Sequence, residues 1–558
     1  MVNISAPTNE LTLEQLGENR PAGFEGVLRD DRLARELYSE GAGIARTLPL
    51  AVAVPANRAS VGELVRWARA NGYSLMPRGS ASGMAAGAIG PGVAVDLSRM
   101  SSIGEVDIAR KRVCVGAGAV RAAVDTAARA VGLGFPVDPS SGAFCTIGGM
   151  VGANAAGART LRFGATRPWV MGLECVFDDG STAWVRRGEP PPLHIPAVGR
   201  LVQMLELMRG NVRRDVLRHT GVRKESSGYA IDAALAPDGG LIDLLVGSEG
   251  TLAMFLQIEL ALIDLPGATG SMLALFDSLE AATECALLAR ELGATACELL
   301  DRTFLDVAAS QAASGVPRGA EAVLLVELEA CDSGAVADAI RAASRVFSAA
   351  GAREISIGLS KDEQHALWTL RHAASPILSS LAPRLRSMQF IEDGCVPPHN
   401  LPAYVRGVRQ LLDRAEFTGV IFGHAGDAHI HVNPLIDVHR DGWRDRVRGA
   451  LLDACELTHR LGGTLSGEHG DGRLRAPLLP HVWSAEARAA FANIKAAGDP
   501  ASVLNAGCKV AVAHDGLSGE LRHDPAARPL SELARTILDR IERERGWNRY
   551  RLSEIPAP

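Results

Sequence analysis

The chain has 558 residues, of which 47% are hydrophobic, 22% charged and 4% aromatic, so it can bury large cores and is not a disordered protein. Its 58 basic residues against 64 acidic ones give a formal net charge of −6, which argues against nucleic acid as the main partner. Only five of the basic residues are lysines, so there is no polybasic tail. Glycine, with 59 residues, exceeds its usual share of roughly 7%, which indicates backbone that turns tightly or approaches a ligand closely.

The cysteines and the N-terminal residues bear on the cellular compartment. Nine cysteines are scattered singly without a CxxC pair, a pattern typical of reduced thiols that excludes a self-contained iron–sulfur cluster of standard spacing. The first residues are polar and acidic, unlike a secretory signal, and no stretch approaches the roughly 18 apolar residues of a membrane span. These features predict a cytoplasmic protein, at most peripheral to the inner face of the membrane.

The elements of the first half alternate between apolar strand patterns and one helical pattern. After a polar N-terminal arm at residues 1–45, ordered structure is expected to begin near Arg46. The sequence then predicts a strand over 48–54, a helix over 61–70 closed by Gly72, a strand over 73–76, a glycine-rich loop over 77–92, a strand over 93–98, a second glycine-rich stretch over 135–164 and a tight turn over 247–251.

The character of the sequence changes past Leu265, where helices and strands alternate as in α/β domains. We therefore place a first domain at 46–264, a second at 265–511 and a C-terminal tail at 512–558. The tail contains a final amphipathic helix with an apolar face formed by Leu533, Ile537 and Ile541.

The two glycine-rich stretches suggest a bound ligand. In PRGSASGMAAG, residues 77–87, glycines permit the positive φ values with which backbone N–H groups converge on an anion, and serines add donors. A plain strand-to-strand loop explains this segment alone equally well. It does not fit the Rossmann pattern, because no GxGxxG opens a helix after the first strand. The second stretch, TIGGMVGANAAG at 146–157, favours the ligand, since small residues can lie flat against a planar cofactor.

Histidines cluster in GHAGDAHIHVNP, residues 423–434. His429, His431 and Asn433 alternate, so on a strand they share one face, while His424 precedes them across a turn. This density favours a metal site over scattered surface or core histidines.

SGEHGDG, residues 466–472, places Glu468 beside His469. Neighbouring side chains on a straight strand point apart, but Gly467 and Gly470 permit a bend that turns both toward one cavity.

Seven motifs together resemble the FAD-dependent D-2-hydroxy acid dehydrogenase family, the D-lactate, D-2-hydroxyglutarate and glycolate dehydrogenase branch of the vanillyl-alcohol oxidase fold. They follow the family's order over residues 46–510: PRGSASG, PVDPSSGAFCTIGGMVGANAAG, SSGYAID, GSEGTL, GHAGDAHIHVNP, SGEHGDG and DPASVLNAGCKV. The resemblance implies an α+β fold, with a vanillyl-alcohol oxidase type FAD-binding domain followed by an α/β FAD-linked oxidase C-terminal domain.

The resemblance also implies how FAD is bound. The family often has PRGGGTG where this chain has PRGSASG, and the two serines retain hydrogen-bond donors. Some members attach the flavin covalently through a histidine in this domain, but no histidine precedes His194, so noncovalent FAD is expected. The implied contacts are Arg78, Gly79, Ser80, Ser82 and Gly83 around the pyrophosphate, Pro139, Ser140, Thr146, Gly149, Asn154 and Gly157 along the flavin, and Glu249, Gly250 and Ile258 near the nucleotide.

The resemblance further makes His424, His431 and Glu468 the ligands of a divalent metal, with zinc expected, and His469 the catalytic base. His429 stands where the family commonly has Asn and is expected either behind the ligands or in contact with substrate; Asn433 is expected behind the ligands. Arg371 matches the family's substrate-carboxylate arginine, although a helix-surface salt bridge fits its local sequence equally well.

The implied reaction is oxidation of a small anionic D-2-hydroxy acid, such as D-lactate. The metal binds the hydroxyl and carboxylate oxygens, and His469 removes the hydroxyl proton as hydride passes to flavin N5. Dicarboxylate-specific relatives have a lysine two residues before an Asp; here Ile391 precedes Asp393 at that offset, which weakens the case for 2-hydroxyglutarate.

Two other interpretations remain open. One is a flavin-binding subunit of a larger electron-transfer complex, and the other is a metallohydrolase, which leaves both glycine segments unexplained. FIEDGCVPP and SGEHGDGRLR resemble relatives fused to a C-terminal iron–sulfur domain, which this chain lacks. The expected electron acceptor is therefore a quinone, an electron-transfer flavoprotein or an iron–sulfur subunit, and the expected assembly is a homodimer.

Overall fold

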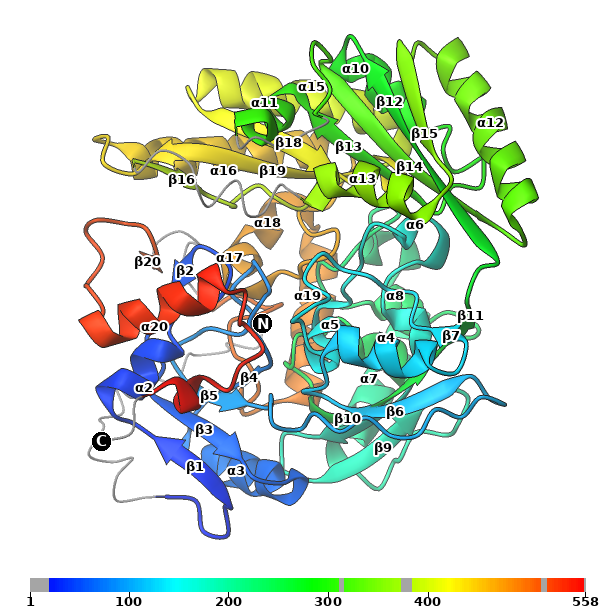
Figure 1. The fold of residues 1–558 in the computed structure, drawn as a ribbon. Helices are drawn as coiled ribbons and strands as arrows, with labels where there is room; N and C mark the ends of the chain where they lie inside the picture. The colour runs from blue at the N-terminus through cyan, green and yellow to red at the C-terminus, as the bar shows by residue number, and fades with distance from the viewer. Residues whose placement is uncertain (1–19, 311–315, 373–383, 513–518, 556–558) are drawn as a thin grey trace.

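The computed structural model describes residues 20–310, 316–372, 384–512 and 519–555, which fold into two lobes (Figure 1). The first 19 residues of the expected N-terminal arm lie outside these ranges, as does part of the loop before the C-terminal helix. Within the described residues, no helix is both long and apolar enough to cross a membrane.

The first sheet has the order β1-β3-β5-β4, in which β3, β5 and β4 run parallel and β1 pairs antiparallel with β3. Helix α3 buries Val61, Leu64 and Val65 against this sheet and ends at Gly72, whose φ of 72° forms the expected cap. The elements are β1 (Gly26–Arg29), α2 (Arg32–Leu37), β2 (Ala45–Arg46), β3 (Ala51–Pro55), α3 (Arg58–Asn71), β4 (Leu75–Arg78) and β5 (Val93–Asp96).

Ordered structure begins earlier than the sequence predicted. The arm was expected to precede the fold up to Arg46, but β1 adds a strand to the first sheet and α2 packs against the C-terminal helix. The sequence of this segment suggested an unstructured arm because it contains few apolar residues. Those that it does contain, notably Leu28, Leu37 and Tyr38, are buried in the fold.

The second sheet is antiparallel, with the order β6-β10-β8-β9, and its buried face packs against helices of the same lobe. Its strands are β6 (Arg112–Gly116), β8 (Val170–Val176), β9 (Thr182–Arg186) and β10 (Met254–Ala261), and β7 (Leu133–Gly134) pairs with β11 (Ile263–Asp264) beside it. The helices are α4 (Arg121–Arg129), α5 (Ile147–Ala153), α6 (Thr160–Phe163), α7 (Pro196–Asn211), α8 (Ile231–Ala234) and α9 (Leu241–Leu245).

The second lobe is built on one large sheet with the order β15-β12-β14-β13-β18-β19-β16, and β17 also pairs with β19. Helices α10, α12, α15 and α16 contribute to the core on one face, and α11 and α13 pack on the other (Figure 1). The strands are β12 (Ala268–Phe276), β13 (Ala296–Asp301), β14 (Ala322–Ala330), β15 (Glu354–Gly358), β16 (Leu385–Ser387), β17 (Gly394–Cys395), β18 (Thr418–Gly423) and β19 (His429–Asp437). The helices are α10 (Leu279–Ala286), α11 (Arg302–Ser310), α12 (Ser333–Ala349), α13 (Lys361–His372), α15 (Leu401–Arg414) and α16 (Trp443–Arg460).

All strand pairs recorded in this large sheet are antiparallel, although helix–strand alternation suggested an ordinary α/β domain. The reason lies in the connections. Helix α10 leads from β12 to β13, but β14 lies between them in the sheet, and α12 likewise leads from β14 across β12 to β15. Alternation along the chain therefore does not reveal which strands are neighbours. The α+β class is confirmed.

The end of the chain returns to the first lobe. Helix α19 (Ala485–Gly498) packs against α7, and Leu504 joins the core of the first sheet, although the sequence assigned both to the second domain. Strand β20 (Glu520–Leu521) pairs with β2, and α20 (Glu532–Arg543) packs on α2. Of the three residues predicted for the apolar face of α20, Ile537 and Ile541 are buried together with Ala534 and Leu538, whereas Leu533 is 42% exposed.

Candidate active site

One continuous cavity joins the two lobes. The first lobe contributes the loop after β4, the segment around α5 and the turn before β10, which are the glycine-rich stretches noted in the sequence. The second lobe contributes Arg371, Gln389, Glu392, Phe422, His424, His431, Asn433, Glu468 and His469. The cavity therefore brings both groups of candidate residues, the glycine loops and the histidine cluster, to a single site.

At two positions the glycine loops leave no room for a side chain. A Cβ on Gly79 would lie 2.1 Å from Thr146 Oγ1, and one on Gly250 would lie 2.3 Å from the Pro77 ring. Gly250 also has a φ of 71°. Thr146 caps α5 by accepting a hydrogen bond from Gly149 N at 3.2 Å. The first-lobe wall of the cavity consists mostly of glycine, alanine and serine residues, whose small side chains leave space for a large planar cofactor.

Most of the predicted FAD contacts line this cavity. They are Arg78, Gly79, Ser80, Ser82, Gly83, Pro139, Ser140, Thr146, Gly149, Glu249 and Gly250. The Ser80 and Ser82 hydroxyls are 3.2 Å apart. These residues, together with the glycines of the loops, form a cavity wall that fits an FAD molecule.

Arg78 reaches the cavity wall, but its guanidinium binds protein. Its Nη atoms donate to the carbonyl oxygens of Tyr38 and Glu40 at 2.8 Å each, and the side chain is 2% exposed. The geometry differs from the expected pyrophosphate contact: Arg78 anchors the N-terminal segment beneath the loop.

Three predicted contacts do not line the cavity. Asn154 caps the C-terminus of α5 with a φ of 52°, and its Oδ1 accepts from Arg167 N at 2.9 Å. Gly157 packs against backbone, since a Cβ there would lie 2.2 Å from Asp138 O. Ile258 is fully buried in β10 between β6 and β8. These three residues therefore lie behind the residues that line the cavity.

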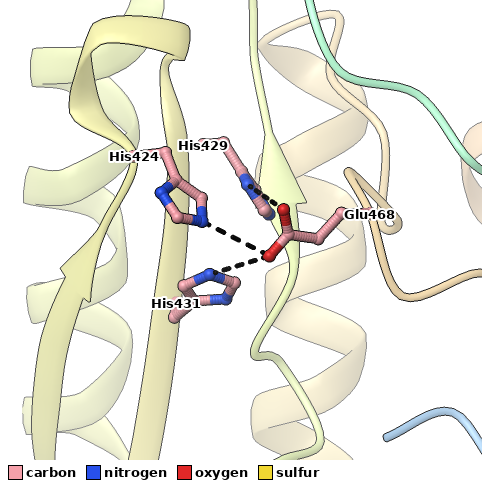
Figure 2. A group of neighbouring side chains, drawn as sticks. All are labelled: His424, His429, His431 and Glu468. Atoms are coloured by element: carbon pink, nitrogen blue, oxygen red, sulfur yellow. Dashed lines mark hydrogen bonds and ion pairs between the residues drawn. The ribbon is translucent and has the colours of Figure 1, made fainter. Parts of the chain in front are cut away.

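The histidine cluster forms at the end of the hairpin between β18 and β19, with Glu468 opposite it on the SGEHGDG loop (Figure 2). The Nε2 atoms of His424 and His431 each lie 3.4 Å from Glu468 Oε1, and His469 Nε2 lies 3.7 Å from the same oxygen. The three ligands expected from the resemblance thus lie together and are buried, while His469 is 26% exposed at the cavity.

The Nδ1 atoms of His424 and His431, which point away from Glu468, each have a hydrogen-bond acceptor. His424 Nδ1 donates to Glu298 Oε1 at 2.6 Å, and His431 Nδ1 donates to Glu392 O at 2.7 Å. Each neutral ring therefore carries its proton on Nδ1 and turns the Nε2 lone pair toward Glu468 Oε1. Burial lowers the pKa of His431, which favours its neutral form. Converging lone pairs of this kind fit a divalent cation between two histidines and one carboxylate.

Lys224 holds Glu468 from behind. Its Nζ donates to Glu468 Oε2 at 3.0 Å and to Gly157 O at 3.3 Å, in a fully buried position. Burial raises the pKa of Glu468, but the adjacent positive charge of Lys224 opposes this effect, and the pKa lies well below its usual value. One carboxylate oxygen is thus occupied by the lysine, and the other faces the histidines.

His429 is fully buried next to Lys224 and does not line the cavity. Lys224 Nζ is 3.4 Å from His429 Nδ1, and His429 Nε2 is 2.8 Å from Asp393 Oδ1. An ammonium group only donates, so Nδ1 accepts and Nε2 carries the proton given to Asp393. Both nitrogens are occupied, which places His429 behind the ligands. Asn433, expected there, instead lines the cavity.

Asp393 bends the SGEHGDG loop. Its carboxylate accepts from Glu468 N at 3.1 Å, His469 N at 2.9 Å and Ser466 Oγ at 3.0 Å. Gly467 must lack a side chain, because a Cβ there would lie 2.7 Å from the His429 ring. The predicted bend that turns Glu468 and His469 into one cavity is therefore present.

His469 is oriented by Glu392. Its Nδ1 donates to Glu392 Oε2 at 2.6 Å, and Arg475 pairs with the other oxygen of that carboxylate. The ring stacks on His431 with centroids 5.4 Å apart. Nε2 thus faces the cavity without a proton in the neutral ring, as a general base requires.

Arg371, near the end of α13, lines the cavity and is not a surface salt bridge. Its Nε donates to Glu298 Oε2 at 2.7 Å, and its guanidinium lies 5.1 Å from the centroid of the Phe422 ring. The arginine therefore stands on the metal side of the cavity, where an anionic substrate would meet it.

The charged partners Lys224, Glu298 and Glu392 were not identified as functional residues from the sequence. A weak signal was present for Glu298 alone, which lies between Cys297 and Leu299 in an apolar strand pattern, since a charged residue is rarely buried there unless it is paired. Their partners lie far away along the chain, so pairing could not be assigned without the fold.

Comparison with known proteins identifies both lobes. Residues 49–186 match the family model of an FAD binding domain, and residues 265–508 match that of the C-terminal domain of FAD linked oxidases. The protein is therefore an FAD-dependent oxidoreductase of the two-domain FAD-linked oxidase class. The resemblance to the FAD-dependent D-2-hydroxy acid dehydrogenase family drawn from the motifs is confirmed.

Relatives with assigned names cover most of the chain. Glycolate oxidase subunit GlcD of Bacillus subtilis is 28% identical, with 90% of this chain and 96% of the relative covered. D-lactate dehydrogenase of Archaeoglobus fulgidus is 27% identical over 82% and 90%, and D-2-hydroxyglutarate dehydrogenase of Xanthomonas citri pv. viticola is 29% identical over 84% and 90%.

Solved structures share the fold at low sequence identity. A 4-ethylphenol oxidase from Gulosibacter chungangensis superposes with a TM-score of 0.61 at 13% identity, covering 89% of this chain and 96% of that one. An alkyldihydroxyacetonephosphate synthase superposes with a TM-score of 0.59 at 13% identity, covering 86% and 82%. The vanillyl-alcohol oxidase type of fold is thereby confirmed.

Proposed function

We propose that this protein oxidises a small D-2-hydroxy monocarboxylate, such as D-lactate, to the 2-keto acid, using noncovalent FAD and a divalent metal, with zinc expected. The observation that carries this proposal is the single cavity whose one wall consists of the glycine loops and whose other wall carries His424, His431, Glu468, His469 and Arg371. A reaction between a flavin and a metal-held hydroxy acid requires this juxtaposition.

Each side chain has a defined task. His424 Nε2, His431 Nε2 and Glu468 Oε1 hold the metal, which when bound supplies a Lewis acid for the hydroxyl and carboxylate oxygens. Arg371 binds the substrate carboxylate, and Glu298 keeps its guanidinium in place.

Proton transfer falls to His469. Its Nε2 faces the metal ligands at 3.7 Å from Glu468 Oε1, and Glu392 accepts the Nδ1 proton and stabilises the imidazolium that forms. FAD, when bound, accepts the hydride from the substrate carbon. The carbon loses a hydride and the hydroxyl loses a proton, which together give the keto acid.

The cavity favours a monocarboxylate. Among the described residues that line its second-lobe wall, Arg371 is the only arginine or lysine, and Gln389, Phe422 and Asn433 are uncharged. Ile391, where dicarboxylate-specific relatives have lysine, is buried and not part of the wall. A second carboxylate on the substrate would find no fixed cation among these residues.

An electron acceptor must then take electrons from the reduced flavin to restore its oxidised form. We expect this acceptor to be a separate partner: a quinone, an electron-transfer flavoprotein or an iron–sulfur subunit. Two features support a separate partner, since the cysteines are scattered and one relative is named as a subunit of glycolate oxidase. A second candidate function is therefore the flavin subunit of such a complex, assembled in the cytoplasm or at the inner face of the membrane.

The proposal is tested by mixing the purified protein anaerobically with D- and L-lactate, D-2-hydroxybutyrate, glycolate and D-2-hydroxyglutarate. We expect bleaching of the flavin absorption with D-lactate or D-2-hydroxybutyrate, restored by an artificial electron acceptor. Faster bleaching by the L-isomers or by D-2-hydroxyglutarate would overturn the substrate assignment, and no bleaching by any of the acids would overturn the function.

A further inference from the structure

A single buried carboxylate joins the two ends of the proposed substrate site. Glu298 on β13 is completely buried, and its two oxygens are divided between two partners: Oε1 accepts from His424 Nδ1 at 2.6 Å, and Oε2 accepts from Arg371 Nε at 2.7 Å. One partner is a proposed metal ligand, and the other is the proposed carboxylate-binding arginine.

The fold places Glu298 there by strand register. β13 pairs antiparallel with β18, with Leu299 opposite Gly423, so Glu298 stands opposite His424, the first residue after β18. Arg371 reaches the same point from α13, which packs on the α11 side of the sheet, where Leu300 of β13 also packs. Three elements thus converge on one carboxylate.

The electrostatic balance requires both partners. Glu298 is completely buried, so its two oxygens depend on the N–H groups of His424 and Arg371 for their hydrogen bonds. The positive charge of the Arg371 guanidinium makes its hydrogen bond to this carboxylate charge-assisted. An isolated buried carboxylate with only one of these donors would be much less favourable.

We propose that Glu298 is a positioning residue that acts on both halves of substrate binding: it turns His424 Nε2 toward the metal and holds Arg371 for the substrate carboxylate. This inference rests on the proposed function, since it takes His424 as a ligand and Arg371 as the carboxylate partner. Glu298 itself contacts neither substrate nor metal.

The decisive variant is Glu298→Gln. Its side chain has nearly the same shape, but the amide has one acceptor oxygen and an NH₂ group, which only donates. Both partners present N–H donors, so Gln can satisfy one of them and opposes the other. Asp301→Asn is the matched control: it lies on the same strand and is buried, but its partners, Phe304 N and Arg409, lie outside the cavity lining.

The experiment measures binding in FAD-loaded protein, with each half of the site examined separately. Zinc affinity is measured by titrating metal-stripped protein without any acid, and pyruvate affinity is measured from the flavin spectrum at saturating zinc. For Glu298→Gln we expect zinc affinity to fall tenfold to a hundredfold and pyruvate affinity to fall about tenfold, with FAD content unchanged. Asp301→Asn should match the wild type in both measurements.

A double-mutant cycle shows whether Glu298 acts on the acid through Arg371. In an Arg371→Met background, Glu298→Gln should cause no further loss of pyruvate affinity. Additive losses, or a Glu298→Gln protein whose zinc or pyruvate affinity stays within twofold of wild type, would overturn the inference. Failure of this inference can be distinguished from failure of the proposed function by the wild-type protein. If the proposed function is wrong, the wild type itself will not bind zinc or will not bind pyruvate.

Discussion

Lys224 and Glu468 form a buried ion pair at 3.0 Å, although 244 residues separate them in the sequence. Lys224 comes from the first lobe and Glu468 from the loop that also carries His469. Burial lowers the pKa of Lys224, but Glu468 and Asp427 outweigh this effect and raise it, so the lysine is charged. The pair therefore joins the lobes at the point where the metal is proposed to bind.

Replacing this lysine should make folding stability depend on metal. Lys224→Met leaves Glu468 buried without its cation, which should cost about 3 to 5 kcal/mol in metal-free protein. A bound divalent ion supplies positive charge at the same carboxylate, so zinc should raise the melting temperature more in this variant than in the wild type. Thermal unfolding with and without zinc measures both effects. Lys111→Met, at an exposed pair with Asp264, is the control; equal metal-free stabilities of the two variants would contradict the prediction.

FAD should be released intact from the purified protein by acid or heat. No histidine precedes His194, and the one cysteine that lines the cavity, among the residues described, is Cys145. Burial raises the pKa of Cys145 to about 11, so it is a thiol rather than a nucleophilic thiolate at neutral pH. Separation of the precipitate from the yellow supernatant tests this. Flavin that stays with the polypeptide in the wild type but not in Cys145→Ser would assign a covalent bond to that cysteine.

Removing a metal ligand should remove metal and activity together. We expect Glu468→Gln and His431→Ala to bind less metal and to reduce flavin with D-lactate far more slowly, while FAD stays bound because the glycine loops are untouched. Metal analysis, the flavin spectrum and stopped-flow reduction are measured on the same sample. Full activity in metal-free protein would rule out a metal role.

His469→Asn should separate proton transfer from metal binding. Because Glu468, His424 and His431 already supply three ligand atoms, metal and FAD are expected to stay near stoichiometric. Flavin reduction should slow by about a hundredfold or more, as the loss of a general base does. Loss of the metal in this variant would instead make His469 a ligand, and unchanged reduction would remove it from the chemistry.

Asp301 should make stability fall as the pH rises. Burial raises its pKa from 3.8 to about 6 in the folded protein. Between these values the folded state holds a proton that the unfolded state has lost, so its contribution is complete below pH 4 and disappears as the pH passes 6. The difference in unfolding free energy between wild type and Asp301→Asn should therefore shift by about 2 kcal/mol against the wild type from pH 4 to pH 7. Urea unfolding at both pH values measures it, and a constant difference would contradict it.

Local sequence signals predicted the parts of the site that depend on local geometry. Gly72 ends its helix, Gly250 turns where no side chain fits, and Gly467 permits the bend that presents Glu468 and His469. Each follows from backbone sterics within a few residues. The His424 and His431 positions likewise follow from a short hairpin.

Features that depend on distant neighbours could not be predicted in this way. The antiparallel order of the large sheet is set by which strand inserts between two others, and the ion pairs of Lys224 and Glu298 join remote segments. The resemblance placed Asn154 along the flavin and Ile258 near the nucleotide, but in the structure Asn154 Oδ1 accepts from Arg167 N and Ile258 is buried within the second sheet. Only the packed structure distinguishes the wall from what supports it.

The cavity between the lobes is bounded by two walls of different composition, one from each lobe. The first-lobe wall consists mostly of glycine, alanine and serine residues, whereas the opposite wall is made of larger side chains on β18, β19 and the adjoining segments. Substitutions at positions such as Gln389, Phe422 or Asn433 can therefore change which acid is accepted while the redox half of the molecule stays as it is. An arrangement of this kind lets the same FAD-binding half be combined with substrate walls that accept different acids.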